Sequence, residues 1–531
     1  MLKKLNLSLF ILVAAGSGLV AQNSPFSFKF EDAATSVAYS SSENPASNSI
    51  SALHIQGDTI WLGTSRGLSR STDRGASWRN YYGDPAFGTE NISAIAWDKY
   101  NGVLWVSTAH SAERSGQTFP EGSGLRYTTD GGETWTKIAQ PLDKESDTAI
   151  VYGNSTLRAL PVTVAIQNIT YDIAVTRGAV WIASFAGGLR KSTDMGVTWQ
   201  RVILPPDFLN SVKPTDNLSF CVSPVPGKFC SEGYLNYRAF SVMATGDSVI
   251  YAGTANGINK STDGGISWVK FNHQNQVNPM SGNFVVGLGN KEGTNEIWAA
   301  TWKAEDLDEF YGVSFSPDGG ENWFTSLDGE RINNFAVFTD KVVAAASGGL
   351  FKSNDFGKNW FSPGNIVDTD SKLSLKTTTF YSAVWAESGT ALYVGTADGL
   401  AKNSGFVGVW PDKWKLYFAS QPLESLEESY AFPNPFSPKT EQVKIKYSTN
   451  GKELNVTIRI FDFGMNYVRT VIQDAPRGNP THTVNTTGIS GVIDFWDGKD
   501  DAGKEVPNGV YFYRIDAGSE KPIFGKIMVL Q

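Results

Sequence analysis

The stretch Ser261-Thr262-Asp263-Gly264-Gly265-Ile266-Ser267-Trp268 decides the fold of this chain, because the chain repeats it. It follows the pattern S-x-D-x-G-x-[ST]-W. The other copies, the last two of them looser, are Ser71–Trp78, Thr128–Trp135, Ser192–Trp199, Ser316–Trp323 and Ser353–Trp360. Self-similarity of this kind is the mark of an architecture built from repeated units.

Each position of the motif has a physical role in a tight turn between two strands. An Asp side chain accepts hydrogen bonds from backbone N–H groups that follow it, and Gly accepts the positive φ that a turn needs. The closing Trp can bury a large apolar area on a neighbouring unit. We therefore expect a structural rather than catalytic role for the aspartates of the six copies, Asp73, Asp130, Asp194, Asp263, Asp318 and Asp355.

The residues before each motif alternate between apolar and polar, as in ISALHI, TIWLGTS and GLSRSTD after Ile50. Four short strands with turns between them predict one antiparallel propeller blade. The segment Leu392–Gly405 keeps the strand pattern but lacks the motif, and with it the count is seven blades over residues 22–420. The motif resembles the Asp-box (BNR) repeat of sialidases, sortilin-type receptors, some glycoside hydrolases and photosystem assembly factors. That resemblance implies a turn that lies away from any active site.

A ring of blades must be closed, and SFKFEDAATSVAY (27–39) is expected to supply a strand that clasps the last blade, with KWKLYFAS as its outer strand. Four insertions interrupt the repeats, at 109–121, 139–166, 204–237 and 302–310. In an up-and-down blade these connections share the face opposite the Asp boxes. Since insertions gather where binding occurs, this insertion-bearing face is the predicted functional surface.

The composition limits the other classes of function. The net charge is −8, which argues against nucleic-acid binding. Residues 1–21 combine Lys3 and Lys4 with a short apolar run and a small-residue exit, which predicts a signal peptide, and no later segment is apolar enough to span a membrane. In an exported protein, Cys221 and Cys230 are expected to form a disulfide rather than a metal site.

Residues 421–430 form an acidic linker, and the repeat pattern of the propeller ends there. PNPF, IRIFD, WDGKD and VPNGVYFYRI predict a small Ig-like β-sandwich over residues 431–531. This string resembles the Ig-like domain of flagellar hook-capping proteins and the C-terminal sorting domain of type IX secretion, although the chain ends IMVLQ rather than in a basic segment. The resemblance implies a role in sorting or attachment at the outer membrane.

No catalytic motif stands out. The F/Y-R-I-P motif of sialidases is missing, so that enzyme would require Arg114, Arg158 and Arg238 to converge on one carboxylate. Glu305 and Asp306 could form an acid/base pair in another glycoside hydrolase or bind Ca²⁺, but a solvated loop is the simpler interpretation. Trp302 and Phe310 could stack on sugar rings or pack their loops. No metal or cofactor is expected.

The sequence therefore predicts an all-β protein, a seven-bladed Asp-box propeller followed by an Ig-like domain. It is expected to be secreted or held on the surface of a Gram-negative-type bacterium. Its predicted function is binding of an extracellular glycan or protein through the insertion-bearing face, with Arg114, Trp302, Glu305, Asp306 and Phe310 as candidate residues. The outer-membrane secretion machinery is a further expected partner. A sialidase-like or other glycoside hydrolase is the alternative.

Overall fold

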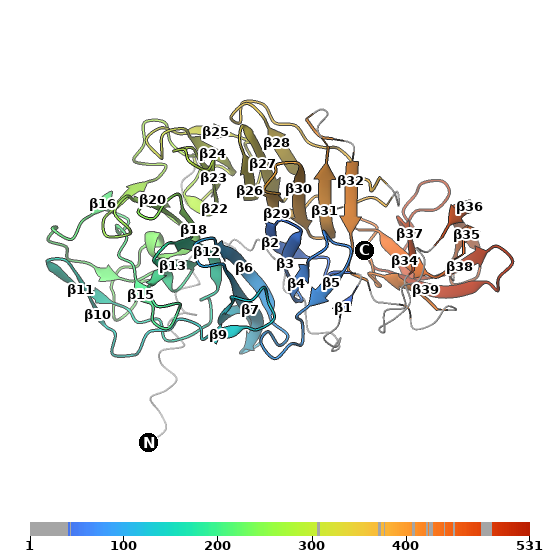
Figure 1. The fold of residues 1–531 in the computed structure, drawn as a ribbon, viewed down its shortest axis with the longest axis horizontal. Coiled ribbons are helices and arrows are strands. Elements are labelled where there is room, and N and C mark those ends of the chain that lie inside the picture. Colours follow the sequence, from blue (N-terminus) through green and yellow to red (C-terminus); the bar gives the residue numbers. More distant parts are fainter. Residues whose placement is uncertain are drawn as a thin grey trace, which may run out of the picture.

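The computed structural model shows an almost entirely β protein (Figure 1). It describes residues 41–42, 44–304, 308–369, 373–375, 377–405, 409–411, 413–420, 423, 428–439, 441–449, 452–478 and 491–531. The expected signal peptide and the segment 27–39 lie outside the described residues. So do Glu305, Asp306 and most of the acidic linker.

The first sheet sets the pattern for the rest. Its strands β2 (Ile50–Gln56), β3 (Thr59–Thr64), β4 (Gly67–Ser71) and β5 (Trp78–Asn80) pair antiparallel in chain order. The motif Ser71–Trp78 forms the turn between β4 and β5. β3 is buried along nearly its whole length because sheets cover both of its faces.

Six more sheets repeat this order among the described residues. They are β6 (Asn91–Asp98), β7 (Val103–Arg114), β8 (Gln117–Thr128), β9 (Thr136–Ile138); β12 (Thr170–Thr176), β13 (Ala179–Ser184), β14 (Gly188–Ser192), β15 (Gln200–Arg201); β18 (Ala239–Ala244), β19 (Ile250–Thr254), β20 (Gly257–Ser261), β21 (Trp268–Phe271); β22 (Phe284–Asn290), β23 (Ile297–Trp302), β24 (Gly312–Ser316), β25 (Phe324–Ser326); β26 (Ile332–Phe338), β27 (Lys341–Ala346), β28 (Leu350–Ser353); and β29 (Phe380–Trp385), β30 (Ala391–Thr396), β31 (Gly399–Ser404), β32 (Lys413–Tyr417).

The innermost strands of the seven sheets contact one another in a ring. Each of β2, β6, β12, β18, β22, β26 and β29 lies against the next, and β29 lies against β2 (Figure 1). Each also carries a β-bulge at its start, as between Thr170 and Asp172, which re-aims the following side chains. Several of those side chains bond to the next sheet, for example Ser51 Oγ to Ile92 O at 3.1 Å and Ser241 Oγ to Val285 O at 2.9 Å.

Among the described residues, the first and last sheets share no strand. β32 supplies the outer strand of the last sheet, as expected for KWKLYFAS, while β1 (Ser41–Ser42) pairs with β5 of the first sheet. The two sheets are joined by a backbone hydrogen bond from Gly399 N–H to Asn48 O at 2.7 Å and by side chains: the Trp78 and Tyr417 rings lie 6.3 Å apart, and Tyr417 Oη donates to Arg74 O at 3.1 Å.

The Trp that closes each Asp box packs against the preceding sheet. At five junctions between successive sheets, this Trp contacts an aromatic residue in the second strand of the preceding sheet. A sixth contact of the same kind joins the last sheet to the first. The clustered pairs are Trp61 with Trp135, Trp105 with Trp199, Trp181 with Trp268, Tyr251 with Trp323, Trp298 with Trp360, and Tyr393 with Trp78. The seventh sheet has no box, so its junction with the sixth is built differently, around Leu350, Leu392 and Trp414.

Two insertions fold together on the third and fourth sheets. The strands β10 (Ala149–Tyr152) and β11 (Ser155–Ala159) form a hairpin, and β11 pairs in parallel with β17 (Cys221–Val222). The strand β16 (Ser211–Val212) extends the fourth sheet beyond β21, and η2 (Leu235–Tyr237) leads into β18. The expected disulfide joins Cys221 and Cys230.

One expectation about these insertions is wrong in part. The β10–β11 hairpin does not stay on the insertion-bearing face, because Tyr152 Oη donates to Ile266 O, inside the Asp box of the fourth sheet, at 2.7 Å. Its apolar residues Ile150 and Leu157 join the cluster that contains Trp181 and Trp268, so burial pulls the hairpin along the outer edge of the ring.

The C-terminal unit consists of two sheets around one core. One sheet contains β33 (Ser429–Phe432), β34 (Val443–Tyr447) and β37 (Val492–Trp496). The other contains β36 (Tyr467–Arg477), β35 (Leu454–Phe461), β38 (Gly509–Ala517) and β39 (Ile523–Val529). Ile458, Trp496 and Tyr513 are among the buried residues that fill the space between them.

This unit docks against the last sheet of the ring (Figure 1). Lys444 of β34 is almost fully buried, and its Nζ lies 2.7 Å from Asp398 Oδ1 and 4.3 Å from the centre of the Phe418 ring. Lys446 Nζ donates to Ser420 Oγ at 3.2 Å. The two lysines therefore fix the C-terminal unit to the turn and tail of the seventh sheet.

Candidate functional site

The Asp boxes form one hydrogen-bonding pattern. In the second sheet, Thr134 donates to Asp130 through its hydroxyl (2.6 Å) and its N–H (2.9 Å), and the Thr128 hydroxyl donates at 2.7 Å. These bonds, led by the Thr134 hydroxyl, hold the pKa of Asp130 well below its usual value. The aspartate's acceptor sites are thus directed at its own turn, and Asp73, Asp194, Asp263, Asp318 and Asp355 repeat the arrangement.

The three arginines of the sialidase hypothesis have separate partners. Arg114, at the tip of the β7–β8 hairpin, pairs with Glu121 at 3.2 Å and is half exposed. Arg158 donates to Phe229 O at 2.7 Å, next to the disulfide. Arg238 donates to Pro224 O at 3.0 Å. In the described part of the chain these contacts of the three guanidinium groups go to three different groups, so they do not form a three-arginine clamp.

The loop that carries Trp302 and Phe310 is anchored by Glu309. This carboxylate is 3% exposed and accepts the N–H of Ala304 at 2.6 Å and the side-chain amide of Asn283, also at 2.6 Å. Phe310 donates its N–H to Ser281 O at 2.8 Å. Glu309 is thus saturated as a structural anchor, and the acid/base pair proposed for Glu305 and Asp306 falls on residues outside the described part of the chain.

Trp302 belongs to a larger cluster that we name the aromatic–arginine arc. Its rings touch in sequence: Tyr171 and Phe185 on Phe240, Phe240 on Phe284, and Trp302 on Tyr311, at centroid distances of 5.6 to 6.1 Å. Phe284 and Trp302 lie in one cluster and face each other across β22 and β23. The members are Tyr171, Phe185, Phe240, Phe284, Trp302, Tyr311, Arg238 and Arg331.

Two arginines complete the arc. The guanidinium of Arg331 lies 4.6 Å from the centre of the Tyr311 ring and 6.0 Å from that of Trp302, and the guanidinium of Arg238 lies 5.4 Å from that of Phe185. Trp302 is held by its N–H, which donates to Ile332 O at 2.7 Å. The arc therefore presents the half-buried rings of Tyr171, Phe185, Trp302 and Tyr311, with planar cations, on the insertion-bearing face of the third to sixth sheets, whereas Phe240 and Phe284 are buried in the core.

Sequence reasoning found Trp302 but missed Tyr171, Phe185 and Arg331. Tyr171 and Phe240 occupy the bulge position at the start of their innermost strands. An alignment of the repeats against one another would have placed both residues at this equivalent position. Arg331 lies in the connection between β25 and β26, where no length increase marks it. Only the folded ring brings these residues together.

Two described carboxylates near this face, Glu90 and Asp172, bond to neighbouring groups of the protein. Glu90 accepts from the Ser123 hydroxyl and lies 3.0 Å from His110 Nδ1. Asp172 accepts the N–H of Val242 at 2.9 Å, and burial raises its pKa to about 7 against the effect of this bond. Across the described ranges there is no group of three or more His, Cys, Asp or Glu side chains that could hold a metal.

A cleft of about 620 Å³ lies where the ring meets the C-terminal unit. Its walls include Arg66, Tyr381 and Asp398 from the first and last sheets, and Phe432 and Glu441 from the C-terminal unit. Because both parts of the chain contribute, this cleft depends on the docking of the C-terminal unit.

Comparisons with known proteins agree with a propeller. The BNR/Asp-box repeat family matches residues 126–137. A probable oligoxyloglucan-reducing end-specific xyloglucanase from Neosartorya fischeri is 33% identical over 102 residues, which are 18% of this chain and only 11% of that protein. Among the described residues, no helix has the length and apolar character needed to cross a membrane.

Two solved structures are similar to this chain at low identity. YCF48 from Cyanidioschyzon merolae is 15% identical, with a TM-score of 0.40 over 70% of this chain and 96% of that one. PorZ, a surface component of the type IX secretion system of Porphyromonas gingivalis, is 14% identical, with a TM-score of 0.31 over 90% of this chain and 64% of that one. The repeat match and the ring of sheets together make this protein a β-propeller with BNR/Asp-box repeats.

Proposed function

We propose that this protein is an exported surface or secreted binding protein: a seven-bladed propeller of residues 22–420 whose insertion-bearing face holds an extracellular partner. The observation that carries the proposal is the aromatic–arginine arc. It combines rings from three neighbouring sheets with two guanidinium groups that lie over aromatic rings. Tryptophan, tyrosine and arginine are the residues that contribute most to binding energy at protein interfaces.

A protein is therefore the first candidate partner and a glycan the second. The rings of the arc lose little side-chain entropy on binding, because Trp302 is already held by Ile332 O and Tyr311 by its contacts with Arg331. Aromatic rings also stack on sugars, so a glycan would use the same groups. Arg114 remains a proposed contributor at the hairpin tip, and Phe310, Glu305 and Asp306 remain proposed contributors from the loop of the fifth sheet.

The rest of the proposal concerns export. Residues 1–21 would be a signal peptide, 421–430 a linker, and 431–531 an Ig-like domain for sorting or attachment through the outer-membrane secretion machinery. Two packed sheets with a common core support the Ig-like interpretation, and the Cys221–Cys230 disulfide supports an oxidising location outside the cytoplasm. The six Asp-box aspartates would be structural, since their acceptor sites bond within their own turns.

The test compares three forms of the full chain, wild type, W302A/R331A and F324A. Phe324 is a matched control, an aromatic ring 60% exposed on the outer strand β25, away from the arc. Each biotinylated protein is applied to a glycan array and to an envelope extract of the producing bacterium. We expect the partner of the wild type to be retained by F324A and lost by W302A/R331A. Equal retention by all three would refute the arc as the binding surface.

A glycoside hydrolase is the second candidate, and the observation in its favour is the local match to the xyloglucanase. The same proteins would be tested with fluorogenic glycosides and xyloglucan oligosaccharides. Turnover by both the wild type and W302A/R331A would show that the protein is a glycoside hydrolase rather than a binding protein. Its catalytic carboxylates would then lie elsewhere on the insertion-bearing face.

A further inference from the structure

The disulfide loop, residues 221–230, lies beside one end of the aromatic–arginine arc. Arg238, a member of the arc, donates from Nε to Pro224 O at 3.0 Å, and its guanidinium lies 5.4 Å from the centre of the Phe185 ring. Pro224 stands inside the loop that the bond between Cys221 and Cys230 closes. One of the two arginines of the arc is therefore held by a carbonyl of a covalently closed loop.

The backbone of Arg238 is fixed by its own hydrogen bonds, but its side chain needs an anchor. The Arg238 N–H donates to Leu235 O at 2.9 Å at the end of η2, and the Arg238 carbonyl accepts from the Ala255 N–H at 3.0 Å. A long arginine side chain loses rotamer entropy when it is held in one conformation. A shift of Pro224 would release one of the contacts that offset this cost and direct the guanidinium.

The sequence of the loop makes its shape depend on the disulfide. Pro224 and Pro226 have no N–H, so neither can donate the hydrogen bonds that hold a strand in a sheet. The Gly227 N–H donates to Cys230 O at 2.7 Å, a bond within the loop itself. The disulfide holds the Cα atoms of Cys221 and Cys230 5.6 Å apart. Because a closed loop has less conformational freedom than an open one, this bond restricts where Pro224 can lie.

Gly233 shows how closely the loop approaches the segment that leads to Arg238. A Cβ added at this glycine would clash with the carbonyl carbon of Val225 and lie 2.5 Å from Pro226 N. Glycine is the residue that allows so close an approach of two backbones. The loop thus packs backbone to backbone against the segment that ends at Arg238.

The second arginine of the arc, Arg331, is held by a residue of the fifth sheet instead. Its guanidinium lies 4.6 Å from the centre of the Tyr311 ring, and its Nη2 donates to the Tyr311 hydroxyl at 3.3 Å. A change confined to the disulfide loop should therefore reach Arg238 and leave Arg331 in place. The two arginines provide an internal comparison within one surface.

We propose that the disulfide loop is a positioning element of the arc, which sets Arg238 for the partner of the insertion-bearing face. The inference rests on the proposed binding function. With the Cys221–Cys230 bond formed, Pro224 O holds the guanidinium against Phe185. Without this bond, Arg238 samples other conformations, and the partner loses one preorganised cationic contact. The disulfide thus serves binding as well as stability.

The first experiment needs no partner. Folded full-length wild type, C221S/C230S and G233A are treated with phenylglyoxal, which modifies guanidinium groups, and each modified arginine is quantified by peptide mass spectrometry. C221S/C230S opens the loop. G233A displaces the loop but keeps the disulfide, so the test does not depend on the folding of the cysteine variant.

We expect Arg238 to react about tenfold faster in both variants than in the wild type, as for one lost hydrogen bond. Arg331 should react at the wild-type rate. Equal reactivity of Arg238 in the three proteins would overturn the inference, whatever the arc binds. An equal rise at Arg331 would also overturn it, because the variants would then loosen the whole face.

A second experiment connects the position of Arg238 to binding. The same proteins, with R238A and K228A, are applied to the glycan array and the envelope extract. K228A is the matched control, because Lys228 is exposed in the same loop and its replacement leaves the disulfide and Pro224 unchanged. C221S/C230S, G233A and R238A should retain about tenfold less of what the wild type retains, and K228A should equal the wild type.

The outcomes separate this inference from the proposed function. Retention that falls in W302A/R331A but not in R238A would keep the arc as the binding surface and refute the role of Arg238. Retention that falls in R238A but not in C221S/C230S or G233A would refute the role of the loop. If the wild type retains nothing, the proposed function fails, and the reactivity of Arg238 alone decides whether the loop positions it.

Discussion

At the scale of single residues, the two glycines of the second Asp box are under different constraints. Both have positive φ, +70° for Gly131 and +93° for Gly132. A Cβ on Gly131 would meet only Arg70 Nη1, at an ordinary contact distance of 4.0 Å, whereas one on Gly132 would lie 2.6 Å from the Trp61 ring and 2.6 Å from the Tyr81 hydroxyl. The first glycine thus serves the turn, and the second also serves the contact between sheets.

We therefore expect G131A and G132A to differ in stability. G131A should lose about 1 kcal/mol, the cost of a left-handed conformation for an L-residue. G132A should lose about 3 kcal/mol or more, because the methyl group also displaces packed rings. Urea unfolding of both variants measures the difference, and equal losses would mean that the Trp61 contact does not limit this position.

Asp172 gives a prediction about pH. Burial raises its pKa to about 7 in the folded state, from an ordinary value of 3.8. Between these pH values the unfolded chain binds fewer protons than the folded one, so Asp172 makes stability fall as pH rises from about 4 to about 7. D172N keeps an acceptor for the Val242 N–H but cannot ionise.

The melting temperature of D172N should therefore exceed that of the wild type more at pH 8 than at pH 5. Other titrating groups are common to both proteins and cancel in the comparison. A difference that is the same at both pH values would show that Asp172 does not titrate in this range.

At the scale of elements, the disulfide closes the loop that follows the insertion strand β17. Replacement of both cysteines by serine should cost about 2 to 3 kcal/mol, the closure entropy of a loop of this size. We expect proteolysis to begin within residues 223–229 in C221S/C230S. Reducing agent should lower the melting temperature of the wild type to that of the variant and leave the variant unchanged.

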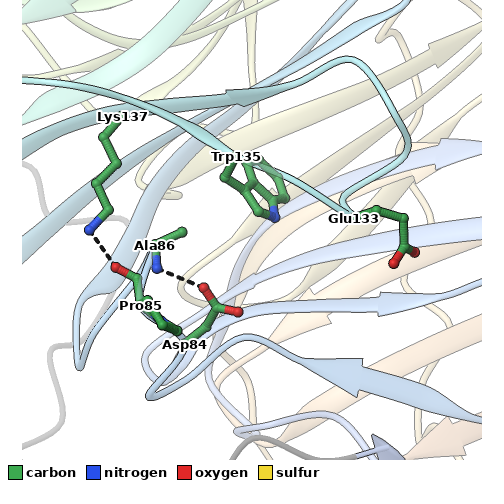
Figure 2. A pocket seen from close by; sticks show the side chains of 6 residues that line it. All are labelled: Asp84, Pro85, Ala86, Glu133, Trp135 and Lys137. Carbon is green, nitrogen blue, oxygen red and sulfur yellow. Dashed lines mark hydrogen bonds between the residues drawn. The ribbon is translucent and has the colours of Figure 1, made fainter.

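The elements themselves could be predicted from the sequence because the repeat defines them locally. Strand alternation and the Asp box specify β2 to β5 and their later counterparts without reference to any distant residue. The path of the β10–β11 hairpin and the aromatic–arginine arc could not be predicted, because both depend on contacts between sheets. The indole N–H of Trp135, a residue that lines the pocket in Figure 2, is buried and unpaired among the described residues. This could not be predicted for the same reason, because Tyr81, from the neighbouring sheet, takes the Gly132 carbonyl.

At the scale of the whole molecule, docking of the C-terminal unit depends on the buried pair of Lys444 and Asp398. K444M leaves the Asp398 carboxylate without its partner, which should cost roughly 3 to 5 kcal/mol. K452M is the control, because Lys452 pairs with Glu520 within the unit and is more than half exposed, so its loss should cost about 1 kcal/mol or less.

Calorimetry and small-angle X-ray scattering of the K444M and K452M proteins would measure the effect on docking of the C-terminal unit. The K444M protein should melt in separate transitions for the ring and the C-terminal unit and should be more extended in solution, while K452M should behave as the wild type. A single transition and unchanged dimensions in K444M would mean that other contacts suffice to hold the two parts together.

In the described part of the chain, the junction between the first and last sheets closes the ring without a connecting segment, through side-chain contacts and the hydrogen bond from Gly399 N–H to Asn48 O. If the C-terminal unit tethers the protein to a cell, every pull on the molecule enters through β32, at this junction. The pair of Lys444 and Asp398 joins the C-terminal unit to the turn between β30 and β31, deeper within the last sheet. It therefore spreads a mechanical load over the whole sheet and protects the outer strand from being peeled away first.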